Sequence, residues 1–99
     1  MKIALPHQNG NVFANFGRTG QFIIYETDHE KIISSKIVFT HGQGAKGLAA
    51  LLAEEEVELV LCKTCGKNGM AALDDECIEV IEGYEGTTEE AVMKYLMVC

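Results

Sequence analysis

The sequence predicts an α/β fold in which a mixed five-stranded sheet carries about three helices on its faces. Short apolar runs rich in β-branched residues alternate with segments whose leucines and alanines recur at helical spacing. Two of the runs are joined by a short link, as in a β-hairpin, whereas the later runs are separated by helices, as in parallel βαβ units. The expected order is β-β-β-α-β-α-β-α over one domain, residues 1–99.

The first half of the chain is expected to form three strands. Lys2–Leu5 is a short apolar run that stops at Pro6. Val12–Gln21 has no clean period and contains two glycines, so we expect a long irregular loop, which in a compact domain is usually functional. Phe22–Glu26 and Lys31–Thr40 are rich in β-formers and make the hairpin, with its turn at residues 27–30.

The second half alternates helix and strand. Continuous apolar runs are typical of buried parallel strands, and leucines at helical spacing mark the helices between them. The last helix has a capping box, in which an N-cap threonine is followed three residues later by a glutamate. The expected elements are a helix at Ala45–Glu55, a strand at Val57–Cys62, a helix at Asn68–Glu76, a strand at Cys77–Ile81 and a helix after Thr87, with Glu90 completing the box.

Composition excludes several classes of protein. Hydrophobic residues make up 47% of the 99 residues, enough for a core, so intrinsic disorder is not expected. The net charge of −7 argues against nucleic-acid binding, which needs clustered Lys and Arg. No apolar run is long enough for a membrane span, and the sequence after Met1 does not follow a signal-peptide pattern. We therefore expect a cytoplasmic protein with reduced cysteines.

The charge is unevenly distributed along the chain. Residues 1–53 carry 5 basic and 3 acidic side chains, whereas residues 54–99 carry 3 basic and 12 acidic side chains, a net charge of −9. Solvated acidic helix faces explain this pattern, and a docking surface for a basic protein partner is the alternative.

Short motifs spread over nearly the whole chain resemble the dinitrogenase iron–molybdenum cofactor biosynthesis family, in its small stand-alone single-domain form. Their order and spacing carry the resemblance, rather than any one of them. The motifs are Met1-Lys2-Ile3-Ala4, Asn15-Phe16-Gly17-Arg18 followed by Phe22-Ile23-Ile24-Tyr25, His41-Gly42 with Gly44, Val60-Leu61-Cys62 with Gly66, Ala72-Leu73, Ile78-Glu79-Val80 and Gly86-Thr87.

The resemblance implies a ribonuclease H-like three-layer fold with strand order 3-2-1-4-5 and an antiparallel second strand. It also implies binding or carrying of an iron–sulfur or iron–molybdenum–sulfur cluster, or a precursor of it, with no reaction of its own. Family members often have a histidine directly before Phe-Gly-Arg, as the candidate cluster ligand. Asn15 stands there in this chain, and an amide is a poor ligand for iron–sulfide centres, so cysteine or another histidine would have to replace it.

The pair Cys62-Lys63-Thr64-Cys65 is the sharpest local feature. It lies between the end of a predicted strand and the start of a helix, where ligands bind in open α/β sheets. Two thiols at this spacing can hold a metal or cluster, exchange a disulfide, or simply be buried. A four-cysteine zinc site would need Cys77 and Cys99 as well, but we expect Cys77 to be buried and Cys99, at the end of the chain, to be mobile.

Two histidines are expected near the thiols. His7 follows the first strand and His41 follows the third, so in the 3-2-1-4-5 order both lie at the same end of the sheet as Cys62 and Cys65. Mixed imidazole and thiolate ligands suit iron or zinc. His7, His41, Cys62 and Cys65 are therefore the candidate metal ligands, although a lone loop histidine is often only solvated.

Glycines and the only arginine are expected to shape the pocket. Residues 42–47 match G-x-G-x-x-G, but the preceding strand belongs to a hairpin and no acidic residue ends the next strand, which disfavours a dinucleotide site. The open amides at the helix start could instead hold an anion, and Arg18 could pair with one or with a nearby carboxylate. The residues expected to shape the pocket are Asn15, Arg18, Gly42, Gly44 and Gly66.

We expect a binding protein rather than an enzyme. The nucleases of ribonuclease H-like folds need clustered carboxylates for metal ions, and the first predicted strand has none. A thiol redox protein that uses Cys62 and Cys65, and an acidic interaction module, remain the alternative functions.

Overall fold

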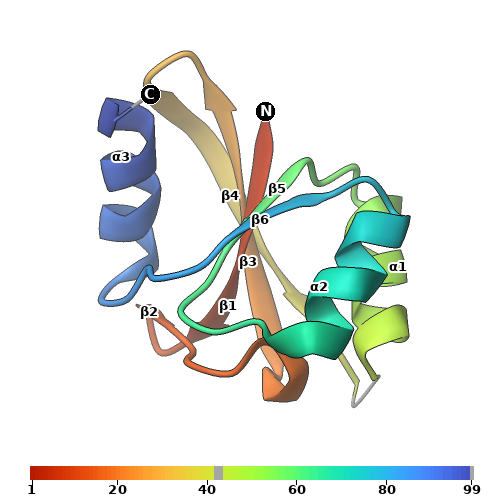
Figure 1. Cartoon of the computed structure of the whole chain (residues 1–99). Coiled ribbons are helices and arrows are strands. Elements are labelled where there is room, and N and C mark those ends of the chain that lie inside the picture. The colour runs from red at the N-terminus through yellow and green to blue at the C-terminus, as the bar shows by residue number, and fades with distance from the viewer. Residues whose placement is uncertain (42–43, 99) are drawn as a thin grey trace.

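The computed structural model describes residues 1–41 and 44–98, which form three layers (Figure 1). A sheet is the middle layer. The helices α1 (Ala45–Glu54) and α2 (Gly66–Asp75) cover one face, and α3 (Thr88–Val98) covers the other. No helix in the described ranges is long and apolar enough to cross a membrane.

The sheet has the predicted topology. Its order is β4-β3-β1-β5-β6, and β3 is antiparallel to both of its neighbours, whereas β5 and β6 continue parallel to β1. Counted along the chain without a short unpredicted strand, this is the order 3-2-1-4-5 with an antiparallel second strand, so the predicted fold is confirmed. The strands are β1 (Lys2–Gln8), β3 (Gln21–Asp28), β4 (Lys31–Phe39), β5 (Leu59–Leu61) and β6 (Glu79–Ile81).

The first strand does not stop at Pro6, as the sequence suggested, but continues to Gln8. The carbonyls of Lys2 and Pro6 face the same side of β1, since they accept from the N–H groups of Glu58 and Phe13. The parallel pairing with β5 on that side ends at Ala4. Proline lacks an N–H group, but Pro6 lies beyond the pairing with β5 and faces Phe13, just outside β2, so the strand tolerates it.

The predicted irregular loop contains two short elements. β2 (Asn11–Val12) pairs with the end of β1, and η1 (Phe16–Arg18) is a single 3₁₀ turn. The Asn15 side chain caps this turn, because its Oδ1 atom accepts from the Gly17 N–H at 3.0 Å. Phe16 is fully buried, so the loop is anchored in the core.

The helices α1 and α2 end without glycine in the same hydrogen-bonded motif. At the end of α2, the Cys77 N–H donates to the Asp74 carbonyl and the Ile78 N–H donates to the Leu73 carbonyl, both at 2.9 Å. This is a Schellman motif, and it gives Cys77 a positive φ of 60°. Cys77 is exposed, so the expected burial of this residue is wrong, and β6 begins only at Glu79. Cys77 follows the C-cap residue Glu76 and is exposed to solvent, whereas the next residue, Ile78, is buried.

The start of α3 follows the predicted capping box in part. Thr87 Oγ1 accepts from the Glu90 N–H at 3.2 Å. The start of α2 differs, since the helix begins at Gly66 rather than Asn68. Gly66 has a φ of +83°, which glycine adopts at little cost.

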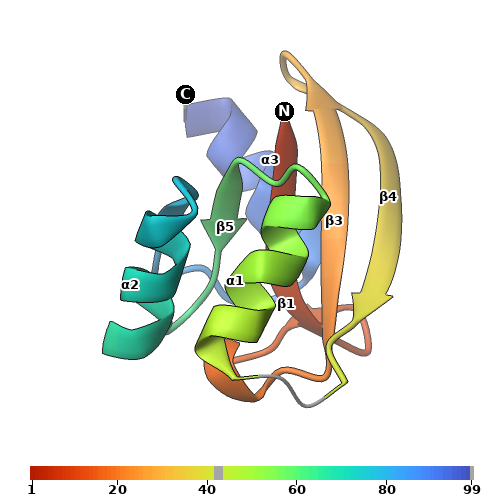
Figure 2. The same ribbon diagram turned by 90° about the vertical axis from the view of Figure 1, so that its right-hand side faces the viewer.

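Each face of the sheet has its own apolar cluster, because successive side chains of a strand point to opposite faces. Phe22 and Ile24 of β3 pack with α1 and α2, whereas Ile23 and Tyr25 pack with α3. Figure 2 shows α1 in front of the sheet and α3 behind it. The two sulfurs of the predicted site belong to the cluster under α1 and α2, so the site is part of the core.

Candidate functional site

The thiol pair lies where β5 ends and α2 begins. Cys62 directly follows β5 and Cys65 directly precedes α2, so a two-residue turn brings their side chains together. Their exposed fractions are 0% and 7%. The predicted pair of neighbouring thiols therefore exists, but it is covered by other side chains.

The two thiols shift each other's pKa in opposite directions. The hydrogen bond with Cys65, followed by burial, raises the pKa of Cys62 far above its usual range. The same hydrogen bond lowers the pKa of Cys65, against burial and the charge of Glu82, which both act to raise it. Cys65 therefore forms the thiolate first, with Cys62 as the thiol that donates to it.

The loop of η1 forms one wall of the site. The Phe16 N–H donates to the Thr64 carbonyl at 3.2 Å, and Asn15 and Thr64 form a β-bridge. This loop thus lies against the turn between the two cysteines. Phe16 joins the cluster that contains both sulfurs, and its ring contacts that of Phe22, with centroids 5.3 Å apart.

Gly69 in the first turns of α2 forms a second wall. A Cβ atom at this position would lie 2.7 Å from Cys65 Sγ and 3.0 Å from Phe16 Cδ2. Cys65 and Phe16 occupy the space that any larger side chain would need. Sequence reasoning did not identify Gly69, although a glycine inside a helix costs about 1 kcal/mol relative to alanine and so indicates a packing constraint.

The segment after β6 holds the turn from the other side. The Cys65 N–H donates to Glu82 Oε2 at 2.7 Å. The Tyr84 N–H donates to the Cys62 carbonyl at 3.1 Å, and the Gly83 N–H donates to the Lys63 carbonyl at 3.2 Å. Sequence reasoning also missed Glu82, because its partner is 17 residues away and nothing local distinguishes it from the other exposed glutamates.

Both ring nitrogens of His7 have partners. Nε2 accepts from the Gly10 N–H at 3.0 Å, so Nδ1 carries the proton and donates to Gln21 Oε1 at 2.8 Å. The ring thus ties the β1–β2 turn to the start of β3. It would have to give up one of these bonds to hold a metal.

His41 and Arg18 lie at the same end of the sheet as the thiols. The N–H and Oγ1 of Thr40 donate to the carbonyls of Gly20 and Thr19, at 3.1 Å and 2.9 Å, which places His41 beside the loop of η1. His41 and Arg18 are both exposed. Arg18 takes part in none of the ion pairs found in residues 1–41 and 44–98.

The glycines lie near α1 and α2. Gly44 is the N-cap residue of α1, is exposed, and lines a pocket between the two helices with Lys46, Asn68 and Asp75. Gly42 lies outside the described residues. Gly66 provides the turn from Cys65 into α2.

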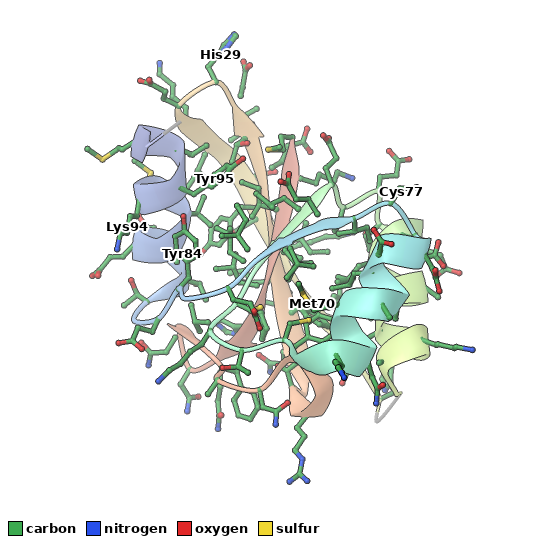
Figure 3. All side chains as sticks on the ribbon, in the orientation of Figure 1. His29, Met70, Cys77, Tyr84, Lys94 and Tyr95 are labelled. Carbon is green, nitrogen blue, oxygen red and sulfur yellow. The ribbon has the colours of Figure 1, made fainter. Side chains whose placement is uncertain are left out.

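The structure does not support a four-cysteine zinc site. Cys77 lies at the opposite end of α2 from Cys65 (Figure 3), separated by ten helical residues, which span about 15 Å. Cys99 lies outside the described residues. In the described part of the chain, no group of three or more His, Cys, Asp or Glu side chains is placed to hold a metal ion.

The acidic side chains of residues 54–99 stay on the surface, and only Glu55 among them is half-buried. Glu55 pairs with Lys36, and Glu85 pairs with Lys63 at 3.2 Å. Solvated acidic faces thus account for most of this charge.

The sequence pattern of the family described as "Dinitrogenase iron-molybdenum cofactor" matches residues 1–98. The chain is also similar to an uncharacterised protein of Methanocaldococcus jannaschii, with 26% identity over 97% of this chain and 86% of the relative.

Solved structures share the fold. The protein PH0822 superposes with a TM-score of 0.90 at 20% identity, covering 99% of this chain and 92% of that one. The apo form of the orange protein from Desulfovibrio gigas superposes with a TM-score of 0.84 at 22% identity, covering 98% and 88%. At these identities the similarity concerns the fold.

Proposed function

Because the chain belongs to the dinitrogenase iron–molybdenum cofactor family, we propose that it binds and hands over an iron–sulfur or iron–molybdenum–sulfur cluster, or a precursor of one. In this proposal the cluster is cargo, and the protein catalyses no reaction of its own. Its place is the cytoplasm, where the thiols stay reduced.

The observation that carries the proposal is the buried thiol pair Cys62 and Cys65, between the carboxyl end of β5 and the start of α2. Thiolates are the ligands that iron–sulfur centres use in proteins. Cys65 has a lowered pKa and lies at the start of α2, where the helix dipole favours negative charge. Cys62 gives up its proton when the cargo binds, since metal ligands must be deprotonated.

The two thiols fit a soft metal centre, provided that a cluster can reach them. Both sulfurs are buried, so the loop of η1 has to move away from Thr64 before a cluster can reach them. The Phe16–Thr64 hydrogen bond, the Asn15–Thr64 bridge and the packing of the Phe16 side chain hold η1 against this turn. The two thiols supply half of the usual four ligands of a cluster, and His41 at the same end of the sheet is a predicted additional donor.

The structural relatives add support at the level of the fold. One of them, the orange protein, was solved in an apo form, a term that implies a group which the protein can bind. We extend that capacity to this chain on the strength of its own thiol pair.

The test is metal and sulfide analysis of protein purified without oxygen, and of protein supplied with iron and sulfide. We expect near-stoichiometric iron and a broad sulfide-to-iron absorption band. The ratio of molybdenum to iron after supply of both metals then distinguishes an iron–sulfur cargo from a mixed one. The double variant Cys62→Ser, Cys65→Ser should lose the iron.

The matched control is Cys77→Ser, which removes the exposed thiol at the far end of α2 and should keep the iron. Iron retained in the double variant would refute the choice of ligands. Wild-type protein that takes up no cluster would refute the carrier proposal.

A thiol redox function is the second candidate, because Cys62 and Cys65 flank one two-residue turn and shift each other's pKa. In that case the wild-type protein would stay metal-free and would lose two thiols reversibly on mild oxidation. The acidic half of the chain suggests a basic protein as the partner in a hand-over, with binding that weakens as salt is added.

A further inference from the structure

β4 is a free edge of the sheet and presents large apolar side chains to solvent. In the described part of the chain it pairs with β3 alone, as Figure 2 shows. Ile33, Ile37 and Phe39 are 60%, 45% and 58% exposed. Their exposed surface is on the order of 300 Å², a size at which an apolar patch is often functional.

The outer side of β4 also offers unpaired backbone groups. The Thr40 N–H donates to the Gly20 carbonyl, so the backbone groups of even-numbered residues here face β3. In an antiparallel strand, those of Ser35, Ile37 and Phe39 then face outward. The bulge opposite Glu26 and Thr27 interrupts this alternation near Ile33, which leaves Ser34–Phe39 as the regular part of the edge.

Charge favours this strand over the other free edge as a contact between two acidic chains. β4 contains no Asp or Glu, and its Lys36 is paired with Glu55 of the same chain. The other edge strand, β6, has three residues and begins with the exposed Glu79. Two chains that each carry a net charge of −7 repel one another least where acidic side chains are absent.

We propose that β4 pairs with the β4 strand of a second copy of this chain, antiparallel about a two-fold axis at Ile37. This register places Ile37 opposite Ile37 and Ser35 opposite Phe39, so all the outward backbone groups of the regular segment find partners. Lys36 lies opposite Val38, so no two like charges are directly opposed, and each Lys36 is paired with Glu55 of its own chain. The joined edges form one continuous sheet with the apolar side chains of both copies adjacent on one face.

The interface is small, so the dimer is weak and depends on concentration. Specific stable interfaces bury more than about 1,000 Å², whereas this one consists of a single strand from each copy. Sedimentation equilibrium over a range of about 10 μM to 1 mM suits such an affinity. We expect wild-type protein to dimerise in this range and Ile37→Asp to weaken dimerisation at least tenfold, because it buries two like charges side by side.

The matched control is Met97→Asp, which replaces a 79% exposed apolar residue on α3. It should leave dimerisation unchanged, and circular dichroism should show both variants folded. A dimer unaffected by Ile37→Asp would overturn the proposal. A wild-type chain that stays monomeric, with β4 amides unprotected from hydrogen exchange, would also overturn the proposal. A different protein would then be the candidate partner of β4.

Engineered disulfides test the register independently. In a Cys77→Ser, Cys99→Ser background, Ile37→Cys should cross-link two copies, since directly opposed residues of a hydrogen-bonded pair lie about 5.5 Å apart. Ser35→Cys should not, because it faces position 39 of the partner. Cross-linking of Ser35→Cys in place of Ile37→Cys would overturn the proposed pairing.

Discussion

The two ends of α2 carry the same residue type in opposite environments. Cys65, before the first residue of the helix, is buried, and the neighbouring thiol of Cys62 lowers its pKa. Cys77, which follows the C-cap residue Glu76, is exposed and has a left-handed backbone conformation. The contrast shows that tertiary packing, rather than position at a helix end, makes a cysteine a candidate ligand.

The largest expected effect comes from Phe16→Ala, which removes a fully buried ring from the wall of the thiol site. We expect a loss of about 3–5 kcal/mol in the free energy of unfolding. Urea denaturation measures this loss. Phe39→Ala, on an exposed ring, is the control and should change stability by less than about 0.5 kcal/mol. Equal losses in the two variants would contradict the packing of η1 against the thiols.

The second effect is on thiol reactivity. With an alkylating reagent under native conditions, Cys77 should react at the rate of a free thiol, whereas Cys62 and Cys65 react only after local opening. We expect protection on the order of 100-fold, which corresponds to an opening free energy of about 2.7 kcal/mol. Mass spectrometry of peptides follows each cysteine separately. Comparable alkylation rates for Cys65 and Cys77 would contradict the different environments at the two ends of α2.

A smaller effect is expected for Gly69→Val, because the space at its Cβ position belongs to Cys65 Sγ and Phe16. Overpacking should cost about 1–3 kcal/mol, despite the better helix propensity of valine. The control is Gly20→Ala, which has open space at the Cβ position and should be close to neutral. Chemical denaturation of both variants decides the point. A stabilised Gly69→Val would show that the cluster around the sulfurs is loosely packed.

The smallest effect concerns the other end of the helix. Cys77→Gly should stabilise the protein by about 0.5–1 kcal/mol, because glycine adopts the positive φ of this Schellman motif without the Cβ penalty. Cys77→Ala keeps the Cβ atom and should be neutral. The shift in midpoint temperature distinguishes them. If Cys77→Gly gives no gain in stability, the loss of the Cys77 side-chain contacts offsets the relief of backbone strain.

Local patterns predicted most of the fold, but not the details at its turns. Apolar periodicity located the hairpin and the three helices, and the resemblance supplied the strand order. The end of β1 was missed because proline usually stops a strand, whereas here Pro6 lies beyond the parallel pairing with β5. The expected burial of Cys77 was wrong, because α2 ends in a glycine-type turn that contains no glycine.

The sequence by itself determined the α/β class and the position of the two thiols after a buried strand, because short-range spacing encodes both. The strand order implied by the family resemblance placed His7, His41 and the cysteines at one end of the sheet. Only the tertiary structure decided that Phe16 and Gly69 enclose Cys65, that Glu82 binds its backbone, and that both nitrogens of His7 are engaged. Those contacts join residues that are distant along the chain, and the physical reason is that packing and hydrogen bonding between elements depend on the final arrangement of all three layers.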